Sequence, residues 1–172
     1  LQPGLAHMHD ILWRVDLGWN MAHAAQVRLG YWGSYRTASV QTGPPDIAGA
    51  DGVDSGLAFV ARYDTRDTSS FATKGMSAQL EYFRSDESLG ADREWQRVEA
   101  AARKAIPIRK NLMWVSLAGG TDLGDGLPGD RTFSLGGPRT LAGYQYDEVR
   151  VNSYLYADAN FLWRLKEVSS IK

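Results

Sequence analysis

Apolar and polar residues alternate with a period of two over several long stretches of this chain, and this alternation constrains the fold more than any other feature. From Ile11 to Trp19 the odd-numbered positions are all aliphatic or tryptophan, and the even-numbered positions include Arg14 and Asp16. A period of two is the side-chain repeat of a β-strand with one apolar face and one polar face. The chain is therefore expected to be all-β, with antiparallel strands.

The same alternation continues along most of the chain. Strands are predicted at residues 11–19, 26–36, 56–64, 76–82, 112–120 and 151–165. A turn is predicted at residues 19–21, and an exposed loop at residues 41–53, where Gly, Pro and Asp gather. Globular strands average about 5 to 6 residues, so the predicted strands are long.

Residues 92–106 fit two structures. Trp95, Val98, Ala102 and Ala105 follow helical spacing as well as they follow a strand, and the alanines favour a helix. Periodicity alone therefore favours a helix in this segment.

Composition narrows the class of protein. The 172 residues suit one domain, residues 1–172, and 19 basic residues nearly balance 20 acidic residues, so nucleic acid is not an expected partner. Cysteine is absent, which excludes disulfides, thiolate metal sites and cysteine nucleophiles. No apolar run reaches the roughly 18 to 20 residues of a membrane-spanning helix, but a membrane β-barrel needs strands of only about 9 to 11 residues.

Two architectures fit the alternation: a soluble sandwich or lipocalin-like barrel, and a transmembrane barrel. Opposite charges are spaced along the polar faces as in the lumen of a membrane barrel, and aromatic residues gather near the predicted strand ends. The spaced charges are Arg14 with Asp16, Arg62 with Asp64, and Asp158 with Arg164. The transmembrane barrel is the favoured architecture.

Two motifs resemble a known family. Residues 62–67 (RYDTRD) with 71–75 (FATKG) resemble the "YDTRDN…FPTKG" hairpin of the outer-membrane surface-antigen superfamily, which includes the BamA, TamA and two-partner transporter barrels. Residues 133–137 (FSLGG) with 141–144 (LAGY) resemble its "F-x-L-G-G…(V/L)-R-G-Y" loop. The motif residues are Arg62, Asp64, Arg66, Asp67 and Gly75 in the hairpin, and Phe133, Leu135, Gly136, Gly137, Arg139, Leu141, Ala142, Gly143 and Tyr144 in the loop.

The resemblance covers about residues 56–165 and implies an antiparallel transmembrane barrel of sixteen strands, of which about seven are present here, so a fragment is expected. It changes the prediction for residues 95–110 from helix to strand. It also implies that residues 125–149 form a loop that enters the lumen, where the family's loop arginine pairs with an acidic wall residue. Here Ala142 occupies that arginine position, and Arg139 is the candidate replacement.

The resemblance further implies a bacterial outer-membrane translocator that exports an attached or partner polypeptide. The "L-A-G-Y" sequence resembles the barrel of patatin-like type V autotransporters. A barrel-assembly factor of the BamA or TamA type and a soluble lipocalin-like ligand-binding barrel remain the alternatives. The expected partners are outer-membrane lipid and the translocated polypeptide, with assembly machinery or a second copy of the chain as further candidates.

Catalytic and metal chemistry finds little support in the sequence. There is no G-x-S-x-G elbow or P-loop, so this chain is not expected to be an enzyme or to hold a cofactor, and a lipolytic passenger would lie outside it. His7 and His9 lack a third ligand and are predicted to lie in a loop or turn. Asp122, Asp125 and Asp130 do not fit a calcium loop and are predicted to form turns. The charged hairpin residues are predicted to form a lumenal network.

Overall fold

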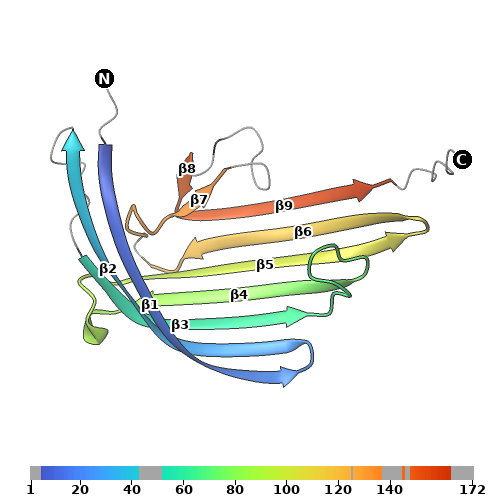
Figure 1. The fold of residues 1–172 in the computed structure, drawn as a ribbon, viewed down its shortest axis with the longest axis horizontal. Coiled ribbons are helices and arrows are strands. Elements are labelled where there is room, and N and C mark those ends of the chain that lie inside the picture. The colour runs from blue at the N-terminus through green and yellow to red at the C-terminus, as the bar shows by residue number, and fades with distance from the viewer. Residues whose placement is uncertain (1–4, 43–51, 125, 137–144, 146–147, 164–172) are drawn as a thin grey trace, which may run out of the picture.

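The computed structural model describes residues 5–42, 52–124, 126–136, 145 and 148–163. Seven strands form one antiparallel sheet in the order β1-β2-β3-β4-β5-β6-β9, and two short strands, β7 and β8, pair separately (Figure 1). The strands are β1 Leu5–Ala22, β2 Ala25–Thr42, β3 Gly52–Asp64, β4 Gly75–Ser85, β5 Trp95–Ile108, β6 Asn111–Asp122, β7 Phe133–Leu135, β8 Val149–Val151 and β9 Ser153–Leu162. The predicted all-β antiparallel class is confirmed.

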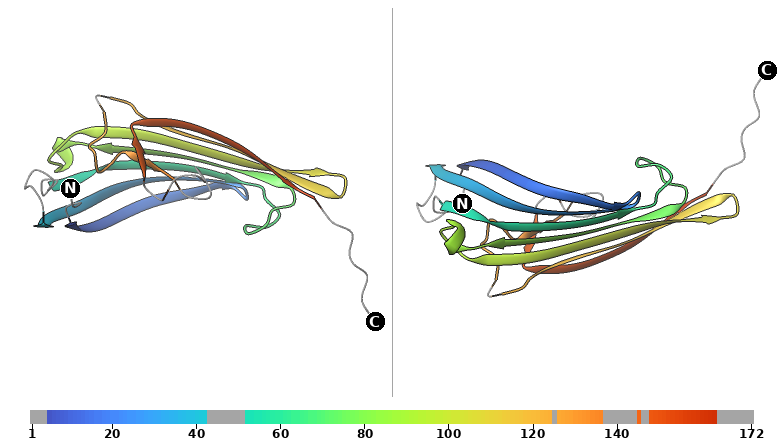
Figure 2. Two further views of the ribbon diagram at one scale, coloured as in Figure 1. Left: turned by 90° about the horizontal axis from the view of Figure 1, so that it is seen from above. Right: turned by 90° about the horizontal axis from the view of Figure 1, so that it is seen from below.

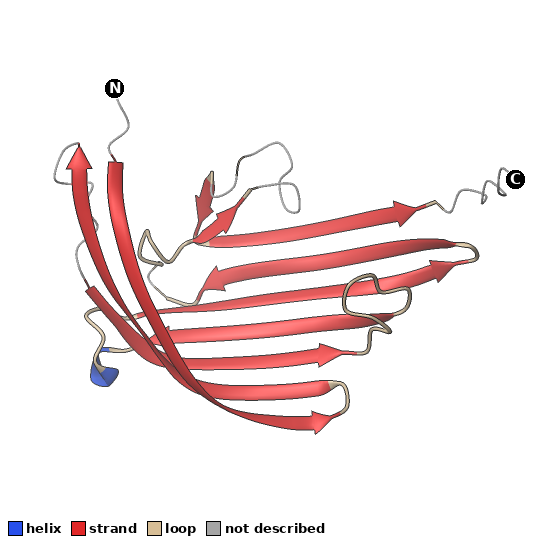
Figure 3. Cartoon of the chain, in the orientation of Figure 1, coloured by secondary structure: helices blue, strands red, loops and turns tan. Residues whose placement is uncertain are grey.

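The sheet is a curved wall rather than a closed barrel within the described residues, because β1 and β9 are its two edges. Figure 2 shows the curvature from above and below, and Figure 3 shows that strands make up nearly all of the regular structure. One short 3₁₀ helix, η2 (Glu87–Leu89), lies between β4 and β5. Among the described residues, no helix is long and apolar enough to cross a membrane.

The two faces of the wall have opposite chemistry. On the face that we call the inner face, Trp32, Ala58 and Trp95 pack against Leu127 and Phe133, which belong to the segment between β6 and β9. Because side chains alternate along a strand, register then assigns every neighbour to a face. The inner face also carries a run of charged residues: Asp10, Arg14, Asp16, Arg28, Arg36, Asp54, Arg62, Glu81, Arg97, Glu99, Arg103 and Asp158.

The opposite, outer face is apolar and exposed. Its exposed side chains include Ile11, Trp13, Val15, Leu17, Trp19, Leu29, Leu57, Leu80, Leu117, Leu155 and Phe161, and Leu155 is 81% exposed. A continuous apolar surface of this extent is rare on a soluble protein and is the usual outer surface of a membrane barrel.

The connections differ in length at the two ends of the sheet. At one end, which we call the turn end, the connections are residues 23–24, 65–74 and 109–110. At the other end, which we call the loop end, β4 joins β5 through residues 86–94 and β6 joins β9 through residues 123–152, a segment that includes β7 and β8. We call residues 123–152 the inner segment.

Two predicted connections are wrong in their bounds. The first turn lies at residues 23–24 rather than 19–21, because pairing continues through Asn20 with Gln26 and Ala22 with Ala25. The loop predicted at residues 41–53 begins later and ends earlier, since β2 extends to Thr42 and β3 starts at Gly52. The intervening residues 43–51 lie outside the described part of the chain.

Residues 95–108 form a strand. The family resemblance predicted this strand correctly, and the helix favoured by periodicity is wrong. Ala102 pairs with Ala78 of β4 on one side and with Leu117 of β6 on the other. Hydrogen bonding to two neighbouring strands outweighs the helix propensity of alanine, because tertiary context overrides local propensity.

Two smaller predictions also need correction. Residues 151–165 do not form one strand: β8 pairs with β7, a bend at Asn152 follows, and β9 pairs with β6. His7 and His9 lie within strand β1, not in a loop, and only His23 lies in a turn.

Candidate functional site

The inner face carries a buried carboxylate, Asp54, at the loop end of β3. Arg93 donates to both of its oxygens, with Nε 2.9 Å from Oδ1 and Nη2 3.0 Å from Oδ2. Arg131 Nε donates to Oδ2 at 2.8 Å, and Trp95 Nε1 donates to Oδ1 at 3.2 Å. Asp54 is only 2% exposed, and an ionised carboxylate at that depth is tolerated only when charged donors satisfy it.

A second carboxylate, Asp130, extends this network. It accepts hydrogen bonds from Arg36 and from Arg93, whose Nη1 and Nη2 each lie 2.9 Å from one of its oxygens. Asp10 lies farther away, 3.6 Å from Arg36 and 3.8 Å from Arg131. Three acids thus face three arginines, and we call Asp10, Arg36, Asp54, Arg93, Asp130 and Arg131 the six-charge cluster.

The cluster joins parts of the chain that are far apart in sequence. Asp10, Arg36 and Asp54 come from β1, β2 and β3, whereas Arg93 comes from the β4–β5 connection. Asp130 and Arg131 belong to the inner segment, just before β7. The arrangement therefore holds the start of the inner segment against the wall at the loop end.

Beyond the cluster, β7 lies against the inner face near the loop ends of β5, β6 and β9. Phe133 is 5% exposed, and its ring centroid lies 5.2 Å from that of Tyr154 in an edge-on contact. The Arg97 guanidinium carbon lies 5.5 Å from the centre of the same ring. A Cβ atom at Gly120 would lie 2.7 Å from Phe133, so this glycine permits the close approach of the ring.

The inner wall also carries charge pairs away from the inner segment. Arg14 contacts Asp16 at 2.6 Å, as predicted. Arg62 does not pair with Asp64 but lies 3.9 Å from Glu81 on the neighbouring strand, since Asp64 is taken by Arg66 at 2.7 Å.

The hairpin motif forms an ordered connection at the turn end. Asp67 accepts hydrogen bonds from the backbone N–H groups of Thr68, Thr73 and Lys74 and from the Thr73 hydroxyl. The Thr73 hydroxyl is the main reason that the pKa of Asp67 lies below its usual range. Gly75 closes the connection at a φ of 91°, a backbone conformation that favours glycine.

The predicted residues of the lumenal loop are only partly described. Phe133 and Leu135 begin and end β7, and Gly136 follows at a φ of 146°. Asp158 lies on the inner face of β9, where Asn160 donates to it at 3.2 Å. The others lie outside the described residues: Gly137, Arg139, Leu141, Ala142, Gly143, Tyr144 and Arg164.

The six-charge cluster as a unit was not predicted from the sequence. The alternation of β3 extends back through Val53 and Ser55, which would have placed Asp54 on the inner face, but the Gly and Asp residues there indicated a loop. Asp130 was predicted only as a turn residue, and it also binds two arginines. Asp122 ends β6, and Asp125 lies outside the described residues.

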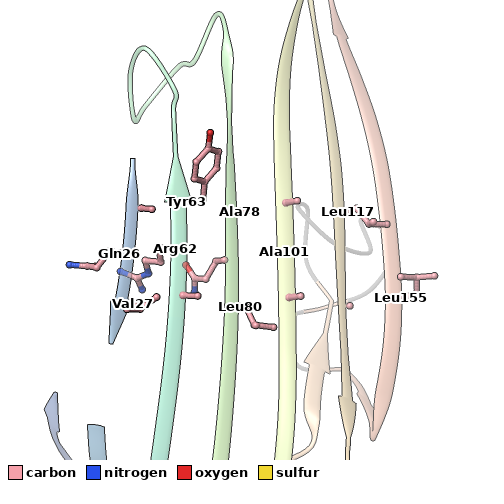
Figure 4. Close-up of a pocket in the computed structure, with 15 residues that line it drawn as sticks. Gln26, Val27, Arg62, Tyr63, Ala78, Leu80, Ala101, Leu117 and Leu155 are labelled. Carbon is pink, nitrogen blue, oxygen red and sulfur yellow. The ribbon is translucent and has the colours of Figure 1, made fainter. Parts of the chain in front are cut away.

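A groove on the outer face carries little polar chemistry. This shallow groove of about 710 Å³ crosses the middle strands, where Ala61, Ala78, Ala100, Ala102 and Gly119 leave room between larger residues such as Leu80 and Leu155 (Figure 4). Across the described ranges, no group of three or more His, Cys, Asp or Glu side chains is arranged to hold a metal ion.

An antiparallel wall with an apolar exposed face, a charged inner face and a strand, β7, lying against that inner face is typical of part of a β-barrel membrane protein. The sequence matches the Omp85 superfamily domain over residues 4–170, and the chain therefore belongs to the Omp85 superfamily. Members of this superfamily are outer-membrane barrels that translocate or assemble proteins. No curated protein matched the chain.

Proposed function

We propose that this chain forms the wall of an outer-membrane barrel that exports an attached or partner polypeptide, in the manner of a patatin-like type V autotransporter. The proposal rests mainly on one observation: Arg131 of the inner segment binds Asp54 on the charged wall. A wall lined by paired charges provides a hydrated path for a polypeptide through the membrane, and a segment bound to this wall can close that path. Lipid contacts the apolar outer face, and the client contacts the inner face.

The loop sequence supports the type V arrangement. Ala142 occupies the position where the superfamily's loop motif has its arginine, which makes this loop similar to that of the patatin-like autotransporters. In this proposal the six-charge cluster supplies a wall contact for the inner segment that does not depend on residue 142.

The lengths of the connections support an orientation. Outer-membrane barrels have short periplasmic turns and longer extracellular loops. The turn end, where two of the three connections are two-residue turns at residues 23–24 and 109–110, then faces the periplasm, and the six-charge cluster lies toward the cell exterior. A client entering from the periplasm meets the turn end first.

Surface display tests the proposal. The protein is expressed with its natural flanking sequence and an epitope tag on the attached or co-encoded polypeptide, and the tag is probed with protease on intact cells. We expect the tag to be cleaved at the surface and the levels of unrelated outer-membrane barrels to be unchanged when the gene is deleted. Loss of those other barrels, with no tag at the surface, would instead identify an assembly factor.

A further inference from the structure

The connection between β3 and β4 differs from its neighbours at the turn end. The adjacent connections are tight turns at residues 23–24 and 109–110, whereas this one spans residues 65–74. In Figure 1 it curls in front of the ends of β4 and β5 instead of extending away from the sheet. We call residues 65–74 the strap.

The strap touches the wall through two adjacent residues. The Phe71 ring stands edge-on to Trp114, with centroids 4.6 Å apart. The backbone carbonyl of Ala72 accepts a hydrogen bond from Trp114 Nε1 at 2.8 Å. The Ala72 side chain is 8% exposed and packs in one cluster with Ala105 and Leu112. The strap has therefore crossed two strands to reach the inner face of β6.

Hydrogen bonds that do not involve Trp114 hold the strap in shape. Asp67 binds the backbone of Thr73 within the strap, and Asp64 at the end of β3 forms a two-point contact with Arg66. By contrast, Phe71 is already 52% exposed, so its departure from Trp114 exposes little additional apolar surface of its ring to water. These contacts suit a segment that moves as a unit, and local opening of such weakly packed connections is common.

The surface beside the strap can hold a peptide. A concavity of about 1400 Å³ extends from the strap across β4, β5 and β6 to β9. Its inner-face lining includes two cations, an acid and two aromatic rings: Arg62, Arg103, Asp158, Tyr156 and Trp114. The Arg103 guanidinium carbon lies over the Trp114 ring, 5.0 Å from its centre. Because Arg103 covers this face of the indole, the ring contacts the strap through its edge and its N–H group.

We propose that Trp114, Arg103 and the small residue Ala105 form a docking site for the client polypeptide, and that the strap occupies this site until a client displaces it. The strap shows the chemistry that the site accepts: an aromatic side chain against Trp114, followed by a small residue whose carbonyl binds Trp114 Nε1. The partner is an extended polypeptide carrying an aromatic–small pair. The inference rests on the proposed export function, and its test is a binding measurement that needs no export.

The probe is a fluorescent peptide with the sequence of residues 68–74, TSSFATK, added to the protein in detergent micelles. We expect at least tenfold tighter binding to a Phe71→Ser variant than to the wild type, because the aromatic position is vacated. Trp114→Leu in the same background removes the ring and the N–H donor, and binding should return to the wild-type level. A peptide with serine in place of phenylalanine is the matched control. Equal binding to wild type and Phe71→Ser, or binding unaffected by Trp114→Leu, overturns the inference.

A cross-link tests the same site in a protein with its aromatic residues intact. Residues 1–172 contain no cysteine, so an Ala72→Cys/Ala105→Cys pair is the only thiol pair within them, and a short cleavable cross-linker can join it. With the surface-display assay, the linked strap should block display and cleavage of the linker should restore it. Full display with the strap linked contradicts the inference, whereas absence of display from the uncross-linked wild type contradicts the proposed export function instead.

Discussion

Arg131 Nε lies 2.8 Å from Asp54 Oδ2, and these two residues are 77 positions apart in the sequence. The pair joins the start of the inner segment to the third strand of the wall. Because Arg93 and Trp95 also donate to Asp54, the carboxylate has no oxygen left unsatisfied. The inner segment is therefore fixed at its first turn, before the loop motif begins at Phe133.

The contact between Gly120 and Phe133 predicts a strong size limit at residue 120. A methyl group there would lie 2.7 Å from the ring, so Gly120→Ala must push Phe133 off the wall. Overpacking of this kind costs about 1 to 3 kcal/mol of unfolding free energy. Urea unfolding in lipid vesicles measures the loss.

The control for this prediction is Gly129→Ala, because a Cβ atom there would meet nothing within 4 Å. Gly120→Ala should also be partly rescued by Phe133→Leu, which gives the added methyl group room. Equal costs at positions 120 and 129 would contradict the packing described here.

The apolar outer face predicts that the cost of a charge depends on depth. Leu117 lies in the middle of β6, and Met113 lies near the turn end of the same strand and on the same face. In a membrane, arginine costs about 2 to 4 kcal/mol at the bilayer midplane and about 0 to 1 kcal/mol near the interface. Leu117→Arg should therefore destabilise the protein more than Met113→Arg does, as measured by urea unfolding in vesicles.

Ser116→Arg provides the inner-face control, since this neighbouring residue points to the opposite side of β6. A soluble barrel that exposed this outer face to water would show almost no cost at Leu117. That outcome would restore the soluble ligand-binding alternative.

The pKa of Asp67 predicts that the strap loosens in acid. Its pKa in the folded protein lies below the usual value because the Thr73 hydroxyl and backbone N–H groups bind the charged form. A depressed pKa contributes stability that is present above the unfolded-state pKa of about 3.9 and is lost as the pH falls through the folded-state pKa. The Asp67 carboxyl should titrate below the usual range by NMR.

Thr73→Val removes the main cause of the depression. The pKa of Asp67 should then rise toward its usual value, while Asp86, whose pKa is lowered mainly by the Ser88 hydroxyl, should not change. An Asp67 pKa that is unaffected by Thr73→Val would show that another group holds the charge.

Much of the wall could be predicted from the sequence, because alternation reports which residues share a face. The outer row of β1 from Ile11 to Trp19 and the strand at 56–64 follow directly from it. Periodicity failed at residues 95–108, where the alanines favour a helix but pairing with β4 and β6 makes the segment a strand. Only the family motif supplied that long-range information.

The candidate site was less predictable, because its residues meet only after the sheet has formed. Asp54 lies in a Gly- and Asp-containing stretch that local chemistry assigned to a loop, and Arg131 precedes the motif that drew attention to Phe133. Neither local sequence indicates that Asp54 and Arg131 make contact in the folded protein. Arg139, the candidate replacement for the loop arginine, lies outside the described residues. The contact with the wall that the structure shows is made by Arg131.

A double-mutant cycle on Asp54 and Arg131 tests the central claim, that this pair holds the inner segment on the wall. Unfolding free energies are measured for Asp54→Ala, Arg131→Ala and the double variant in lipid vesicles. Each single change should cost about 1 to 3 kcal/mol, since it removes one charge-assisted contact while Arg93 still binds Asp54 and Asp130 still lies beside Arg131. The two costs should fall short of additivity by about 1 to 3 kcal/mol. Costs that add to within about 0.5 kcal/mol would show that the pair does not hold the inner segment on the wall.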